Sequence, residues 1–125
     1  MTGREVLNRA MQLLGYTNGY GEVDGLRDAE LMKRGTTAVD QILTDLRRIE
    51  SPGWTAEGTV NLDAPLPLSP DAAKDAMTYG VAMLLAQGES DGDAQGLFAQ
   101  LYNRKRAGVK APASRRADVL PRVNL

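Results

Sequence analysis

The stretch SPDAAKDAMTYGVAMLLAQG, residues 69–88, decides the fold. Its first three residues supply a helix N-cap, a proline suited to the first helical position and an acid in the first turn. The side chains that follow are apolar around most of the helix circumference, which is typical of a helix buried among others. We therefore expect a central helix that ends at Gly88, with Ala76 and Gly80 small enough to let another backbone approach closely.

A long helix is predicted before this stretch. It should begin between Asp24 and Asp28 and run to Ile49, because Pro52 and Gly53 end it. Apolar or small residues recur at spacings of three and four, so they form one buried face. The members of that face are Leu31, Gly35, Ala38, Val39, Ile42, Leu46 and Ile49.

A short helix is predicted at the start of the chain. Thr2 and Glu5 have the spacing of a capping box, in which each side chain satisfies the backbone N–H of the other. Gly15 suits the left-handed conformation that commonly ends a helix. The apolar residues between them share one face and are Val6, Leu7, Ala10, Met11 and Leu14.

A fourth helix is predicted between Asp91, its N-cap, and Gly108. Its apolar face consists of Ala94, Leu97, Phe98, Leu101 and Tyr102. We expect Leu101, and Leu84 of the central helix, to be buried. The stretch from Asp91 also begins like a calcium-binding loop, but Tyr102 stands where a bidentate glutamate is required, so capping is the preferred interpretation.

The connection between the second and third helices, residues 51–69, is long for a small bundle, and such loops are often functional. Pro65 and Pro67 forbid a helix and favour extended chain. Two interpretations stay open. The loop is a strap across the helices with Trp54 and Leu62 as its pins, or it projects and contacts a partner. The candidate contact residues are Trp54, Val60, Leu62 and Leu66.

These elements predict an all-α fold: a small four-helix body with a Pro-rich loop and an extended C-terminal arm. The body spans residues 1–108 and the arm residues 109–125. The chain contains no Cys and no His, which excludes thiol and imidazole chemistry and most zinc sites. We expect no catalytic residue, no metal and no cofactor. We also expect a cytoplasmic protein, because no signal segment and no apolar run of membrane-spanning length is found.

The chain ends in a basic segment. Residues 104–125 carry seven cations against one anion, whereas residues 1–103 carry eight cations against fifteen anions. An acidic body with a basic end indicates an interaction segment rather than an enzyme surface. Arg104, Lys105 and Arg106 also fall in the last turn of the fourth helix, where cations complement the helix dipole. A solvated end without a partner is the simpler alternative.

The arm has no helical or strand period, and Pro112 and Pro121 interrupt regular structure. We expect it to bind a partner through arginines that fork onto carboxylates and aliphatic side chains that fill pockets. The candidate binding residues are Arg115, Arg116, Val119, Leu120, Pro121, Arg122 and Val123.

Several segments together resemble the head–tail connector, or head-completion, proteins of tailed bacteriophages. They are REVLNRAMQLLGY (4–16), PLPL (65–68) leading into DAAKDAMTYGVAMLLA (71–86), LFAQLYN (97–103) and LPR (120–122) in the basic tail. The resemblance covers most of the chain and rests on the order of its helices and loop.

The resemblance implies a small helical protein without catalytic activity. Such proteins assemble with copies of themselves as a ring, typically a dodecamer, beneath the portal protein. The ring extends the channel for packaged DNA, without sequence-specific binding, and offers a surface to the stopper or tail-completion protein. The arms of such proteins clasp the portal or neighbouring subunits. The implied location is the neck of the virion, after assembly in the host cytoplasm and without contact with a membrane.

A different class of function fits the same tail: a small nucleic-acid-binding or regulatory protein whose arginines bind phosphates. Against it, the tail has no aromatic side chain to stack on bases, and the helices show no basic recognition face. An enzyme that uses carboxylates alone is a third class, but the acids that pair in this sequence are explained as caps.

Overall fold

A computed structural model describes residues 1–16, 25–53 and 60–110, the side chains of residues 25–28 excepted. Its elements are α1 (Gly3–Leu14), α2 (Gly25–Glu50), the π-helical segment η1 (Ala72–Ala76), α3 (Met77–Gly88) and α4 (Gly92–Ala107). Within these ranges there is no strand, only an isolated bridge between Thr2 and Pro65. The prediction of an all-α, four-helix body is therefore confirmed.

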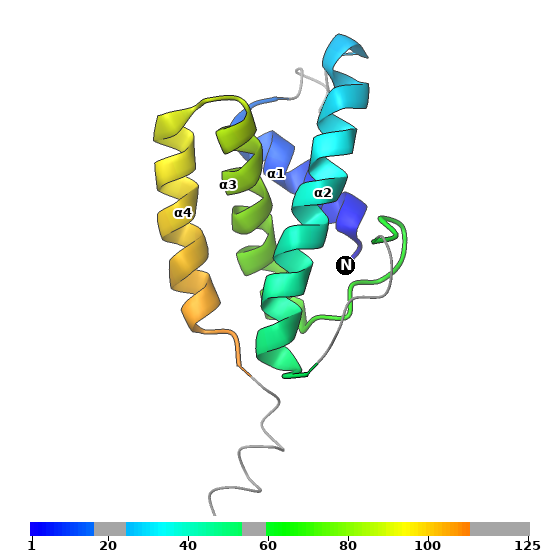
Figure 1. Cartoon of the computed structure of the whole chain (residues 1–125), viewed down its shortest axis with the longest axis vertical. Helices are drawn as coiled ribbons and strands as arrows, with labels where there is room; N and C mark the ends of the chain where they lie inside the picture. The colour runs from blue at the N-terminus through cyan, green and yellow to red at the C-terminus, as the bar shows by residue number, and fades with distance from the viewer. Residues whose placement is uncertain (17–24, 54–59, 111–125) are drawn as a thin grey trace, which may run out of the picture.

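Helix α3 lies at the centre, as its composition predicts. It contacts α1, α2 and α4, and Figure 1 shows it between α4 and α2 with α1 crossing behind. Met77, Val81, Ala82 and Leu85 are fully or almost fully buried in this arrangement. The burial of apolar side chains on every side of α3 is the main favourable contribution to the fold.

Side chains from neighbouring helices pack against the glycines of the core. At Gly80 we expected the backbone of another helix to pack there instead. A Cβ atom at Gly80 would lie 2.8 Å from both Ile42 Cδ1 and Tyr102 Cε1. In the same way, a Cβ at Gly35 would lie 2.6 Å from Leu7 Cδ1. The missing side chains therefore leave hollows that larger residues fill, which keeps the core dense.

The predicted helix ends are largely confirmed. Thr2 Oγ1 accepts the N–H of Glu5 at 3.2 Å, and Glu5 Oε1 accepts the N–H of Thr2 at 3.3 Å, which completes the capping box. Gly15 adopts the left-handed conformation, with φ of 76°. Asp91 Oδ1 accepts the N–H of Ala94 at 3.1 Å, so this carboxylate serves as a cap.

The entry to α3 differs from the expected regular helix. Ser69 Oγ accepts the N–H of Ala72 at 3.3 Å, which agrees with the predicted cap. From Ala72 to Ala76, however, the chain is π-helical, and the N–H of Met77 bonds to the carbonyl of Ala72, five residues earlier. The side-chain pattern does not reveal this widened turn, because both helix types present Ala72, Ala73 and Ala76 to the core.

The described part of the long loop is a strap, which supports the first of the two interpretations for residues 60–69. The N–H of Arg4 donates to the carbonyl of Leu62, and the N–H of Leu66 donates to the carbonyl of Met1, each at 2.9 Å. Arg4 Nε also contacts Asp63 Oδ1 at 2.7 Å. These bonds attach the loop to the start of α1.

Leu84 and Leu101 are less buried than we expected. Leu84 and Leu101 pack against the core but are only half-buried. Leu84 lines a groove between α2 and α3, together with Ala38 and Lys33. Leu85, one residue further along α3, is the residue that the core encloses. In the part of the chain that the structure describes, no helix combines the length and apolar character needed to cross a membrane.

Candidate partner-binding site

The predicted arm contacts lie outside the described residues, as does Trp54 of the loop. This applies to Arg115, Arg116, Val119, Leu120, Pro121, Arg122 and Val123. The other predicted loop contacts, Val60, Leu62 and Leu66, are half-buried and pack against the core. Those three side chains therefore hold the strap in place as well as lining its surface.

Two of the three cations that precede the arm, Lys105 and Arg106, are bound to acids of the body. Arg106 donates from Nε to Asp45 Oδ2 at 2.7 Å and from its terminal nitrogen to Asp45 Oδ1 at 2.9 Å. Tyr102 also donates its hydroxyl hydrogen to Asp45 Oδ2. Lys105 Nζ lies 3.8 Å from Asp75 Oδ2. Helix-dipole compensation alone does not explain these cations, because they also tie α4 to α2 and η1.

The cluster of Asp45, Tyr102 and Arg106 shifts the titration of its members. The hydrogen bonds from Arg106, followed in effect by the bond from Tyr102, hold the pKa of Asp45 below its usual value against the opposing effect of burial. Burial, reinforced by the bond to Asp45, raises the pKa of Tyr102. The carboxylate is thus ionised and the phenol neutral at neutral pH, the protonation states that these three hydrogen bonds require.

Replacing Asp45 with asparagine should lower the free energy of unfolding by about 1–2 kcal/mol at pH 7, because partly exposed charge-assisted bonds are lost. The folded-state pKa of Asp45 is depressed, so its contribution is present above a pH of about 4 and is lost as the pH falls further. Urea titrations of both proteins at several pH values between 7 and 3 should therefore show a difference that shrinks on acidification.

Asp40→Asn is the matched control for this prediction. Asp40 lies on the same helix, and within the described ranges its side chain makes no hydrogen bond or ion pair. It should change the free energy of unfolding by less than about 0.5 kcal/mol. If the loss of unfolding free energy caused by Asp45→Asn stays constant between pH 7 and pH 3, the depressed pKa assigned to Asp45 is wrong.

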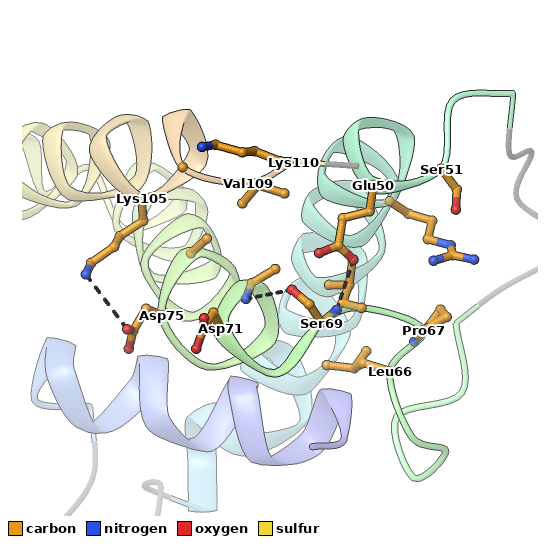
Figure 2. Close-up of a pocket in the computed structure, with 15 residues that line it drawn as sticks. Glu50, Ser51, Leu66, Pro67, Ser69, Asp71, Asp75, Lys105, Val109 and Lys110 are labelled. Carbon is orange, nitrogen blue, oxygen red and sulfur yellow. Dashed lines mark hydrogen bonds and ion pairs between the residues drawn. The ribbon is translucent and has the colours of Figure 1, made fainter. Parts of the chain in front are cut away.

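A groove lies where α2 ends, η1 begins and α4 ends; we call it the end groove. Its volume is about 930 Å³. Figure 2 shows its side chains converging from these elements and from the strap. It is lined by Arg47, Glu50, Ser51, Leu66, Pro67, Leu68, Ser69, Asp71, Ala72, Asp75, Ala76, Lys105, Gly108, Val109 and Lys110.

Glu50 sets the shape of the end groove. It is only 7% exposed, and its Oε1 accepts the N–H of Ser69 at 2.9 Å. The carboxylate of α2 thus satisfies a donor next to the start of the following helical segment, where the positive end of the helix dipole favours an anion. This contact fixes the end of the strap against the end of α2.

The rest of the end groove offers both apolar and polar contacts. Leu66, Leu68 and Val109 are half-buried and pack against the core. Asp71 is exposed and has no ion-pair partner within the described ranges. Arg47 Nε is buried and, within the same ranges, has no hydrogen-bond partner. Because a buried donor without a partner is costly, this nitrogen is available to an acceptor from solvent or from a bound group.

No sequence motif marks the end groove. Its residues come from three separate stretches, 47–51, 66–76 and 105–110, and the pattern of each stretch predicts only a helix end, a loop or a cap. The only sequence signal for a binding surface here is the pair of acids, Asp71 and Asp75, that follows the proline-rich loop. No group of His, Cys, Asp or Glu residues suited to holding a metal occurs in the described part of the chain.

Comparisons with protein-family models, with curated proteins and with solved structures find no match for this chain. The described residues form a four-helix body with a buried central helix.

Proposed function

We propose that this protein is a head–tail connector subunit of a tailed bacteriophage, a structural virion protein without enzymatic activity. In this proposal, copies of the chain form a ring beneath the portal protein. The resemblance to connector proteins implies a dodecamer. The ring extends the DNA channel and presents a surface to the stopper or tail-completion protein. It belongs to the neck of the virion and is assembled in the host cytoplasm.

The proposal is supported by the attachment of the end of α4 to the body and by the basic composition of the sequence that follows it. Asp45 and Asp75 bind Arg106 and Lys105, so the last turn of α4 is attached to the body. Beyond Lys110, the segment 111–125 contains three arginines, one aspartate and four large aliphatic residues. A rigid body with an adhesive end is what a ring subunit needs to join two larger assemblies.

The acidic balance of residues 1–103 supports the same proposal, since a wall of like charge lets packaged DNA pass without being trapped. The alternative, a nucleic-acid-binding protein that uses its tail on phosphates, has fewer cations available than the sequence suggests. Lys105 and Arg106 already bind carboxylates of the body. Salt-dependent binding of the monomer to duplex DNA would favour that alternative.

Deleting residues 111–125 should leave the body folded and abolish joining to the head. The cut is placed after Lys110, because Val109 packs against the core. The far-UV circular dichroism signal per molecule should match that of the full chain, because the deletion removes none of the described helices. Completion of DNA-filled heads, scored as the fraction that acquires tails, should fall to background.

Leu120→Asp should act like the deletion, because a charge replaces a side chain assigned to an apolar pocket. Lys110→Ala is the matched control and should matter little, since it leaves every assigned contact of the arm in place. Wild-type yields of completed heads from the truncated, folded protein would refute the role given to the arm.

A further inference from the structure

The end groove is open at the point where the described chain stops. Val109 and Lys110, the last two described residues, are among its lining residues. In Figure 2 the Val109 side chain lies between the end of α4 and Ser69 of the strap, within the groove. The chain therefore already enters the end groove with its last two described residues.

The chemistry of the end groove matches that of the segment. The half-buried Leu66 and Leu68 offer apolar surface to aliphatic side chains, and exposed Asp71 offers a carboxylate to an arginine. Arg47 Nε has no hydrogen-bond partner within the described ranges, and a backbone carbonyl of an extended peptide is a suitable acceptor for it. Four large aliphatic residues, three arginines and one aspartate occur between residues 111 and 125.

We propose that the end groove is the docking site of the chain's own C-terminal segment, with Val119 and Leu120 against its apolar wall. Leu120 lies about ten residues beyond Lys110, a loop length whose closure costs little entropy. Docking within one chain also proceeds at an effective concentration in the millimolar range, whereas a second copy must reach that concentration by diffusion.

Docking of this kind is an autoinhibitory contact. The aliphatic residues of the segment are covered in the free protein, and a partner must displace them from the end groove before it can bind the segment. The docking itself concerns the chain alone, whereas its inhibitory effect rests on the proposed function, in which a partner binds the segment. Under that function, the contact restrains association until the correct surface is present.

The absence of cysteine allows a direct test by disulfide formation in the full-length protein. Ala117→Cys places a thiol beside the docking residues without removing them, and Ser51→Cys places the second thiol in the end groove. The control pair combines Ala117→Cys with Asp93→Cys. Asp93 is exposed in the first turn of α4, about 22 Å along the helix from Gly108.

We expect the Ser51 pair to cross-link within one chain about tenfold faster than the Asp93 pair, at a rate independent of protein concentration. Adding Leu120→Asp should slow cross-linking of the Ser51 pair and leave the control rate unchanged. Equal rates for the two pairs, cross-links only between chains, or a Ser51 rate that Leu120→Asp leaves unchanged would overturn the proposal. Far-UV circular dichroism of each variant confirms that the body remains folded.

Discussion

Leu85→Ala is expected to lower the free energy of unfolding by about 2–5 kcal/mol, the largest effect of any substitution considered. Leu85 is 1% exposed and lies on central helix α3, within a core cluster that includes residues of α1, α2 and α4. Truncation to alanine removes the transfer free energy of three carbon atoms. It also leaves a cavity that a densely packed core refills only in part.

The neighbouring Leu84 is the matched control for this prediction. The same substitution, Leu84→Ala, should cost about 1 kcal/mol, because this side chain is half-buried at the groove between α2 and α3. Reversible urea unfolding followed by circular dichroism measures both. Equal costs, or a larger cost at Leu84, would mean that α3 is rotated about its axis relative to the structure.

Gly80→Ala should destabilise the protein by about 1–3 kcal/mol, although alanine favours a helix more than glycine does. The new Cβ would meet Ile42 Cδ1 and Tyr102 Cε1 at 2.8 Å, and Ile42 Cγ2 at 2.9 Å. The ring of Tyr102 cannot swing aside easily, because its hydroxyl binds Asp45. Relief of the contact therefore requires Ile42 to change its side-chain conformation and α4 to shift relative to α3.

Gly96→Ala provides the matched control, with an effect of opposite sign. Gly96 lies within α4, and nothing lies within 4 Å of the position that its Cβ would occupy. Here the helix propensity of alanine acts alone and should raise the free energy of unfolding by about 0.5–1 kcal/mol. Thermal melts of the two variants should shift in opposite directions. A stabilised Gly80→Ala protein would show that the packing around α3 is looser than described.

Features that depend on neighbours within about four residues were predictable. The capping box at Thr2, the left-handed Gly15 and the cap at Asp91 all follow from bonds between nearby backbone and side-chain groups. The amphipathic faces of α1 and α2 follow from periodicity, which places side chains on one side of a helix whatever it packs against.

The candidate site was predictable only in part. The charge of the C-terminal segment is visible in the sequence, and it still motivates the proposed function. The end groove is not visible there, because Glu50, Ser69 and Val109 come together only when the ends of three segments meet. For the same reason, the sequence does not reveal that Arg106 is bound to Asp45 and is not free to bind a partner.

The sequence by itself determined most helix ends and that α3 is the buried one, since caps, breakers and composition act locally, but it did not reveal the π-helical entry to α3. Tertiary structure alone decided which side of α3 is best enclosed. A helix that is apolar around most of its circumference has no amphipathic period to orient it, so Leu84 and Leu85 are equivalent as sequence. Their difference arises from the placement of α1, α2 and α4, which leaves a groove beside one leucine and closes over the other.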